Sequence, residues 1–279
     1  MAVARPRRSA VLTARALNRA LLARQLLLRR SGDSPLAVLA HVTGQEAPPP
    51  PAPPYIGLWS RVPDFDADEV PAPVPGAVRF LPAGHRGRPG RPAFVTAEAW
   101  RGARPPGGPS PAALVHRYLA AFGPATLADI EKRCGPAGVA ASAVRELAGF
   151  TDEAGRALFD LPGAPRPAPD VPAPVRFLPA GDAVLLAHAD PSRLLGGPFR
   201  RRLVTRHGHW PPVFLVDGFV GGCWEVRYEG SRVLLVLTPF GTLAGDERAD
   251  VVEEGCRLLR FLRPETDQLD LVIRQDGAR

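Results

Sequence analysis

The pattern of apolar and polar positions is clearest in the middle of the chain. Three segments there place their apolar side chains on one helical face: Pro111 to Phe122, Leu127 to Cys134 and Val139 to Ala148. Ser110 and Thr126 stand at the N-cap positions of the first two segments. The stretch GFTDEAGRALFDLP that follows is typical of two strands joined by a turn. Helices followed by a hairpin in this order predict a winged helix-turn-helix.

The N-terminal part reads as helices interrupted by proline. Ala10 to Arg30 forms one amphipathic pattern, and Leu36 to Val42 forms a second, with Ser34 as its N-cap. The first segment is rich in arginine and free of acid, as in an organellar transit peptide. Its apolar pattern continues into further structure, however, and this favours an ordinary first helix. Pro48 to Pro54 predicts extended polyproline II, and Tyr55 to Val62 predicts a short helix.

Towards the C-terminus the period of the apolar positions changes to two, which is typical of strands. The expected strands are Val175–Leu178, Val184–Ala187, Val213–Val216, Gly221–Tyr228 and Val233–Leu237. Asp217-Gly218 and Glu229-Gly230 are hairpin-turn dipeptides. Ala244 to Leu262 predicts a closing helix, and we expect the residues after it to be loose. Together these features predict an antiparallel β-barrel-like domain.

The fold class expected from these patterns is α+β, with helical and winged-helix modules followed by a C-terminal antiparallel β-barrel-like domain. The expected boundaries are a helical module (a partial winged helix) at 1–70, a Pro/Gly/Arg-rich linker with short strands at 71–109, the winged helix-turn-helix at 110–162, a Pro-rich linker at 163–174, the β-domain at 175–263 and a tail at 264–279. The linker at 71–109 offers few apolar side chains. We therefore expect Leu17, Leu21, Leu26 and Trp59 to be half-exposed, and either to dock on the β-domain or to drive self-association.

The net charge of the chain gives a first indication of what the protein binds. The formal net charge is +7 and the pI about 10.3, so nucleic acid or an anionic membrane is the first partner to consider. Lys132 is the only lysine among 35 basic residues, and GC-rich coding DNA also produces such an arginine excess. No apolar run reaches the roughly 18 residues of a membrane span. The three cysteines have neither metal nor disulfide spacing, so we expect a cytoplasmic protein without a metal or cofactor.

One basic segment is denser than the rest of the chain. It contains Arg193, Arg200, Arg201, Arg202, Arg206 and His207. Such a cluster can neutralise several phosphates whatever the base sequence, although a solvated basic loop has the same composition. On the expected recognition helix, Arg145 is joined only by Ser142 and Glu146 as polar side chains. This set is too small to read bases strongly in a major groove.

Gln45 and Glu46 form a polar pair just before the proline run. Either side chain can orient a water, and a carboxylate can stabilise an oxocarbenium-like sugar cation, as in glycoside hydrolysis. Excision of a flipped base from DNA breaks a bond of the same kind. Two polar residues before a proline run are also usual in a solvated loop, so the residues themselves leave both interpretations open.

Several segments together carry a family resemblance. They are RALNRALLARQLLLRR, SPLAVLAHVTG, PPYIGLWSRVPDFD, GRPAFVTAEAW, LVHRYLAAFGPATLADIEKRCG, LFDLPGAPRP, VRFLPAGDAVLLAHAD and FLVDGFVGG. In this order they resemble the bacterial winged-helix DNA-binding proteins that include the crosslink-unhooking alkylpurine DNA glycosylases (AlkZ-like). The resemblance implies tandem winged helices and a β-barrel curved around duplex DNA.

The resemblance also directs attention back to the Gln45-Glu46 pair. In the family's glycosylases a Gln-x-Gln element before the Pro-Tyr segment supplies the catalytic residues. Here the place reads GQEAP. Counted from Gly44, the two glutamines fall on Glu46 and Pro48; counted from Tyr55, they fall on Ala47 and Pro49. After FDAD the family continues with a wing and a further helical module, whereas here Val70 leads almost at once to GRPAFVTAEAW. The resemblance therefore implies an internal deletion and a degraded motif.

From these features we expect a protein that binds duplex DNA without strong sequence specificity, through phosphate contacts, with glycosylase activity reduced or lost. The first alternative is a DNA glycosylase, a hydrolase in which Glu46 or Gln45 and a water break the N-glycosidic bond of an alkylated or crosslinked base. The second alternative is a truncated interaction module with no role on DNA. Bound to DNA, the protein would lie at the nucleoid.

Overall fold

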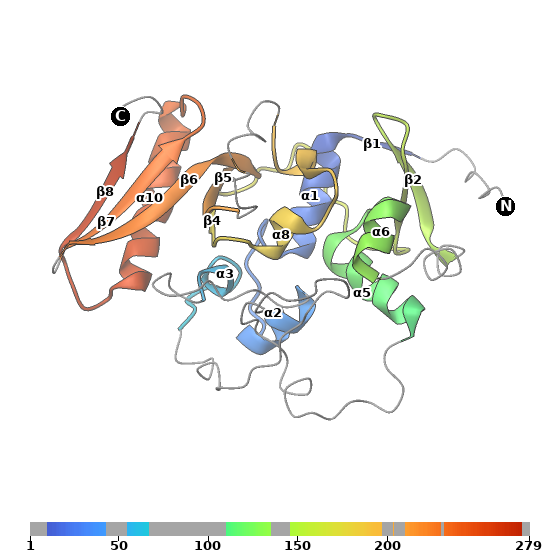
Figure 1. Cartoon of the computed structure of the whole chain (residues 1–279), viewed down its shortest axis with the longest axis horizontal. Helices are drawn as coiled ribbons and strands as arrows, with labels where there is room; N and C mark the ends of the chain where they lie inside the picture. The colour runs from blue at the N-terminus through green and yellow to red at the C-terminus, as the bar shows by residue number, and fades with distance from the viewer. Residues whose placement is uncertain are drawn as a thin grey trace, which may run out of the picture.

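The computed structural model of the chain describes residues 10–42, 55–66, 110–134, 146–196, 203, 210–229 and 232–274. The described elements form an elongated molecule (Figure 1). A small sheet formed by strands β1 to β3 lies at one end and a larger sheet with helix α10 lies at the other. Helices α1 and α8 lie between these two ends (Figure 1). This α+β arrangement, helices first and a large sheet afterwards, agrees with the expected fold class.

The central region contains the expected helices and hairpin. Helix α5 (Pro111–Phe122) is capped by the Ser110 side chain, which accepts a hydrogen bond from the Ala113 N–H at 3.2 Å. Helix α6 (Leu127–Cys134) begins after Thr126, whose hydroxyl accepts from the Asp129 N–H at 3.2 Å. Strands β2 (Ala148–Asp152) and β3 (Ala157–Asp160) form the antiparallel hairpin. Residues 139–145 of the predicted third helix lie outside the described residues, and its predicted end was wrong, because Ala148 is already the first residue of β2.

A short N-terminal strand completes this sheet. Strand β1 (Val11–Leu12) pairs in parallel with β2, giving a three-stranded sheet in the order β1-β2-β3. Helix α1 then runs from Ala14 to Arg24, with Thr13 as its N-cap. The prediction of one helix to Arg30 was too long. Leu26 has a left-handed φ of 57°, and this conformation ends the helix because it breaks the right-handed backbone path.

The other N-terminal helices follow the prediction. Helix α2 spans Pro35–His41 and is capped by Ser34, whose hydroxyl accepts from the Ala37 N–H at 3.3 Å. Helix α3 is a single turn, Ile56–Trp59, as expected after the proline run.

The large sheet is open, so the predicted barrel was wrong. Its order is β4-β5-β6-β7-β8, and in the part of the chain that the structure describes no strand pairs β4 with β8. Strands β4 (Arg176–Leu178), β5 (Val213–Val216), β6 (Phe219–Glu229) and β7 (Arg232–Pro239) are antiparallel.

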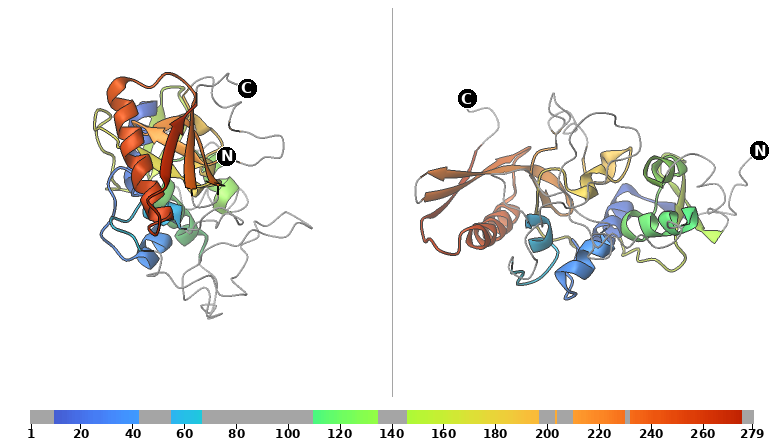
Figure 2. Two further views of the ribbon diagram at one scale, coloured as in Figure 1. Left: turned by 90° about the vertical axis from the view of Figure 1, so that its left-hand side faces the viewer. Right: turned by 60° about the horizontal axis from the view of Figure 1, so that its bottom comes forward.

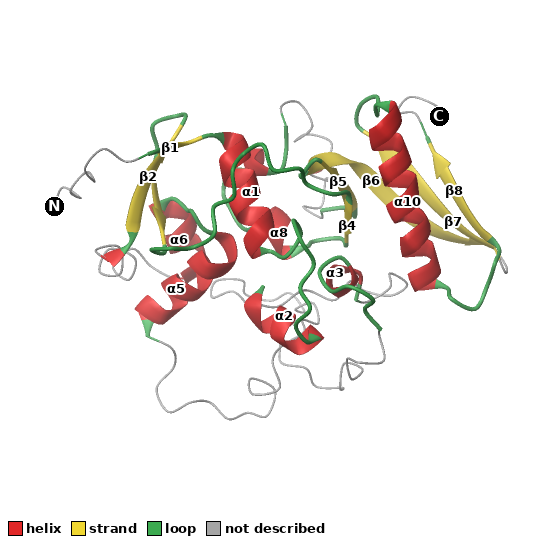
Figure 3. Ribbon diagram, turned by 180° about the vertical axis from the view of Figure 1, so that it is seen from behind, coloured by secondary structure: helices red, strands yellow, loops and turns green. Residues whose placement is uncertain are grey.

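The reason for the open sheet lies in its last connection. Helix α10 (Gly245–Leu262) joins β7 to β8 (Leu269–Ile273), and β8 pairs with β7 in parallel. A parallel neighbour needs a crossover connection, which α10 provides along one face of the strands (Figures 2 and 3). The crossover returns the chain to β7 instead of β4. Of the residues after 263, which we expected to be loose, Leu269–Ile273 therefore form the last strand of the described sheet.

Two local predictions in this domain had opposite outcomes. The predicted strand Val184–Ala187 is helix α8 (Ala183–Leu186), because the Asp182 side chain accepts from the Val184 N–H at 3.1 Å and caps a helical turn. The predicted hairpin turn at Asp217-Gly218 is confirmed. Both residues have positive φ values, 46° and 81°, as a two-residue turn between twisted strands requires.

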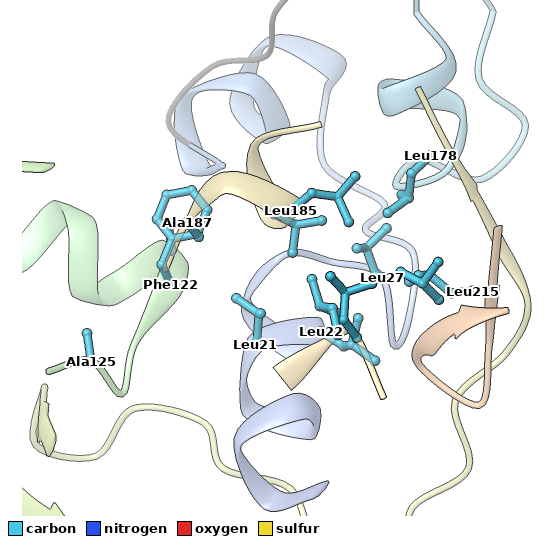
Figure 4. Close-up of a cluster of buried hydrophobic side chains, with 14 of the residues drawn as sticks. Leu21, Leu22, Leu27, Phe122, Ala125, Leu178, Leu185, Ala187 and Leu215 are labelled. Carbon is cyan, nitrogen blue, oxygen red and sulfur yellow. The ribbon is translucent and has the colours of Figure 1, made fainter. Parts of the chain in front are cut away.

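The N-terminal segment is built into the hydrophobic core. One core cluster joins α1 to the central helices and to strands of the large sheet, and Leu21, Leu27, Phe122 and Leu215 belong to it (Figure 4). A second cluster joins α2 and α3 to the large sheet and α10. The predicted half-exposure was wrong for Leu17, Leu21 and Trp59, which are 4%, 0% and 7% exposed. Of the two alternatives, the apolar face docks on the rest of the same chain.

Within the described residues, no helix is both long enough and apolar enough to cross a membrane.

Candidate nucleic-acid interface

The positive charge of the chain is unevenly distributed. Of the 35 Lys and Arg residues, 15 lie outside the described residues, whereas only five of the 28 Asp and Glu residues do. The described part therefore holds 20 basic and 23 acidic residues and has no positive excess. Any electrostatic attraction to phosphate must come mainly from segments 1–9, 67–109, 135–145 and 197–209.

The basic segment predicted from the sequence lies almost wholly in that remaining part. Arg200, Arg201, Arg202, Arg206 and His207 fall outside the described residues. Their neighbour Leu203 is described and is 0% exposed, within the first core cluster. The chain is thus anchored in the core in the middle of the basic segment. Contacts of these five side chains with phosphate stay a prediction.

Arg193 lies inside the protein. It is 7% exposed, and its Nη1 donates a hydrogen bond to the carbonyl of Pro124. Nη1 also lies 3.0 Å from His188 Nε2. Burial lowers the pKa of Arg193. Because its guanidinium is occupied by protein groups, we leave Arg193 out of the proposed interface.

His188 and Asp129 continue this buried polar group. His188 Nε2 lies 3.0 Å from the Phe122 carbonyl, and burial together with the charge of Arg193 lowers the pKa of His188 to about 3. Burial alone would raise the pKa of Asp129, but hydrogen bonds from the Ala189 N–H at 2.8 Å and from Thr126 lower it. The imidazole is therefore neutral and the carboxylate charged near pH 7. The group ties the start of α6 to the segment after α8 and is closed to solvent.

The part of the molecule formed by α5, α6 and the β2–β3 hairpin offers few uncommitted cations among its described residues. Arg145 lies outside the described residues, so its contact with DNA also stays a prediction. At the hairpin, Arg156 is bound to Asp152 at 2.6 Å and to Asp190 at 2.8 Å. Lys132 and Arg133 are exposed at the end of α6. The described surface of this module can therefore add only a few phosphate contacts.

The candidate catalytic pair, Gln45 and Glu46, also lies outside the described residues, between α2 and α3. Both flanking elements are firmly held. At the end of α2, His41 Nε2 lies 2.7 Å from the carbonyl of Arg24. Just after α3, the Ser60 hydroxyl lies within hydrogen-bond distance of the carbonyls of Ile56 and Phe177. The described residues on either side of the pair are therefore held by contacts with other parts of the chain.

Three buried arginines of the N-terminal segment form ion pairs that the sequence analysis missed. Arg61 binds Asp182, Arg24 binds Asp160 and Arg19 binds Asp217. The three arginine side chains are at most 1% exposed, and of the acids only Asp217 reaches the surface, at 41%. A signal was present for one of them, because Arg24 continues the apolar stripe of Leu17 and Leu21 at helical spacing. An arginine on a buried stripe requires a buried acceptor, but the sequence does not say which one.

In the described ranges, no three His, Cys, Asp or Glu side chains lie together as possible metal ligands.

Comparison with known proteins identifies the family to which the chain belongs. A family model described as DNA glycosylase AlkZ-like matches residues 74–261. Gln45 and Glu46 precede this range. A solved structure, the Streptomyces sahachiroi DNA glycosylase AlkZ, is 22% identical and covers 66% of this chain and 52% of that chain, with a TM-score of 0.48. The chain thus spans about half the length of that protein. No curated protein matches the sequence.

Proposed function

Because the chain belongs to the DNA glycosylase AlkZ-like family, we propose that it binds duplex DNA through phosphate contacts, without strong sequence preference, and that its base-excision activity is reduced or lost. The observation that carries the proposal is the family match across residues 74–261, which includes the winged-helix region and most of the large sheet. The net positive charge of the chain supports it, since phosphate attraction is independent of base sequence.

The distribution of charge makes this proposal specific. The described framework holds no positive excess, so we assign the phosphate contacts to basic segments attached to it. The segment with Arg200, Arg201, Arg202 and Arg206 is the strongest candidate, because Leu203 in its middle is anchored in the core. An interface of this kind gives affinity that falls steeply with salt and changes little with sequence.

A second candidate function is excision of an alkylated or crosslinked base. Glu46 or Gln45 would orient a water towards the sugar carbon, and the carboxylate of Glu46 would stabilise the positive charge that develops there. Support comes from the family and from the contacts that hold His41 and Ser60, on either side of the segment that carries the pair. Against full activity stands the GQEAP sequence, which lacks the second glutamine of the family's catalytic element.

One experiment separates the two candidates. The protein is incubated with unmodified, alkylated and crosslinked duplexes, and abasic sites and gel shifts are scored on the same samples. We expect similar shifts on all duplexes and few abasic sites. Absence of a shift on every duplex at low salt contradicts DNA binding. Excision as fast as that of a dedicated glycosylase contradicts the loss of activity.

A further inference from the structure

Helix α1 occupies a central position in the molecule, between the three-stranded sheet and the five-stranded sheet (Figure 1). It precedes the family match at 74–261, yet its polar side chains reach both sides of the matched region. Arg24 at the C-terminal end of this helix contacts the β2–β3 hairpin, and Asn18 and Arg19 in its middle contact the turn between β5 and β6.

At the β2–β3 hairpin, which we call the wing, Arg24 binds the last residue of β3, Asp160. Its Nη1 and Nη2 bind the two carboxylate oxygens of Asp160 at 2.7 and 2.8 Å, and Nη1 also donates to the Leu119 carbonyl at 2.8 Å. The two side chains are 1% and 0% exposed. A Cβ on Gly123 would lie 2.4 Å from Arg24 Nη1, so there is no free space around the contact. A bidentate pair of this kind fixes orientation as well as distance.

At the five-stranded sheet, side chains of α1 bind the turn between β5 and β6. Arg19 forms an ion pair with Asp217, and its Nη1 donates to the Asp217 carbonyl at 3.0 Å. Asn18 Nδ2 donates to the carbonyls of Gly218 at 2.7 Å and Arg193 at 2.8 Å. Gly218 has a φ of 81°, and a Cβ there would lie 2.6 Å from Asn18 Oδ1. The turn therefore sits directly on the helix.

The proline-rich segment that connects the two modules is bound along the same helix. Arg15 Nε donates to the Pro169 carbonyl and Arg19 Nε to the Val171 carbonyl, both at 2.6 Å. Arg24 Nε donates to the Pro165 carbonyl at 3.3 Å. Proline has no N–H, so this segment makes few internal hydrogen bonds, among them the one from the Val171 N–H to the Ala168 carbonyl at 3.2 Å, and other carbonyls are available to such donors. The linker is thus held by arginines and is no free spacer.

We propose that α1 is a brace that sets the angle between the wing and the five-stranded sheet, and that Arg19 and Arg24 are positioning residues for duplex binding. The proposal rests on the proposed function for its DNA part. In the chain, the basic segment at 197–209 leads into β5 of the five-stranded sheet, and segment 135–145 leads into β2 of the three-stranded sheet. Two weak phosphate-binding surfaces act together on one duplex only if their separation and orientation match it.

The angle can be measured without DNA. Spin labels are placed at Ala154 on the wing turn and Ala249 on α10, both exposed, in a chain whose three cysteines are replaced by serine. Double electron–electron resonance then reports their distance distribution. We expect one narrow distribution for the unaltered brace. Arg19→Met and Arg24→Met should broaden or shift it, and Arg24→Lys should lie between them and the unaltered protein.

The matched control is Arg232→Met. It removes the same charge and an ion pair with Asp270, but both partners are about half exposed and lie on the five-stranded sheet. Its distance distribution should equal that of the unaltered brace. We expect the Arg19→Met variant to remain folded, because its partner Asp217 is 41% exposed and keeps its ion pair with Arg15. Unchanged distributions in the folded Arg19 and Arg24 variants would overturn the brace.

The effect of the brace on DNA binding is tested by measuring affinity for duplexes of two lengths. On a duplex of about 30 base pairs, long enough for both modules, the brace variants should bind about tenfold more weakly. On a duplex of about 10 base pairs, one helical turn, their affinity should match that of Arg232→Met. Equal losses at both lengths would overturn the positioning role. If the unaltered protein binds no duplex, the proposed function fails, whereas the label distances still decide on the brace.

Discussion

Arg61 and Asp182 form a fully buried, bidentate ion pair between the end of α3 and the start of α8. Both N–O distances are 2.9 Å, and both side chains are 0% exposed. Arg61 Nε also donates to the Gln25 carbonyl at 3.0 Å, just after α1. The pair therefore joins the ends of three helices at one point.

Loss of this pair should be costly. Arg61→Met leaves the Asp182 carboxylate buried without its cation, and breaking a buried pair in this way costs about 3–5 kcal/mol. We expect a corresponding fall in the free energy of unfolding, measured by urea denaturation. Arg232→Met, at a pair exposed to solvent, should cost less than about 1 kcal/mol. Equal effects of the two substitutions would show that the buried pair adds nothing to stability.

Stability should also fall as the pH is lowered, because of His188. Its pKa is about 3 in the folded protein against an ordinary 6.5, so between these values the unfolded chain binds the extra proton. The free energy of unfolding should drop by at most about 1.4 kcal/mol for each pH unit below 6.5. The pKa of Asp129 is lowered from 3.8, so protonation of its carboxylate reduces the free energy of unfolding only below about that pH. The check is urea denaturation of the His188→Gln variant at pH 7 and 4.5. In this variant the fall in the free energy of unfolding between the two pH values that His188 causes should be absent.

Binding to DNA should depend on the basic segment and weaken with salt. Replacing Arg200, Arg201 and Arg202 together with alanine should lower the slope of log K against log salt by about 0.9 for each phosphate that the variant no longer neutralises. The control replaces Arg227, Arg232 and Arg260, which are equally charged, exposed and described on the sheet and α10. Fluorescence anisotropy at several salt concentrations measures both slopes. A segment that is only solvated would leave the slope unchanged.

Any excision activity should be weak and should depend on Glu46 more than on Gln45. Glu46→Gln keeps the shape of the side chain and removes its charge, so we expect it to abolish residual release of alkylated bases. Abasic sites formed on an alkylated duplex give the measurement, with Gln45→Ala as the comparison. A rise in activity for Glu46→Gln would instead mean that the family's glutamine chemistry operates in this chain.

The sequence by itself determined the elements whose signals are local. Helices α5 and α6 begin at Ser110 and Thr126 because their hydroxyls supply the missing acceptors of the first turn. The turn at Asp217-Gly218 is encoded by two residues that tolerate positive φ. The family resemblance was equally readable, since it rests on ordered segments of sequence and needs no contact between them.

Only the tertiary structure decided the features that depend on partners far apart in the chain. A short apolar run such as Val184–Ala187 suits a strand or a helix, and the Asp182 cap, held by Arg61 from 121 residues away, selected the helix. Strand β8 exists because α10 returns the chain to β7. Arg24 is buried because Asp160, 136 residues away, meets it with both oxygens. Such a charge can leave water only where its partner is already in place, and no local pattern contains that information.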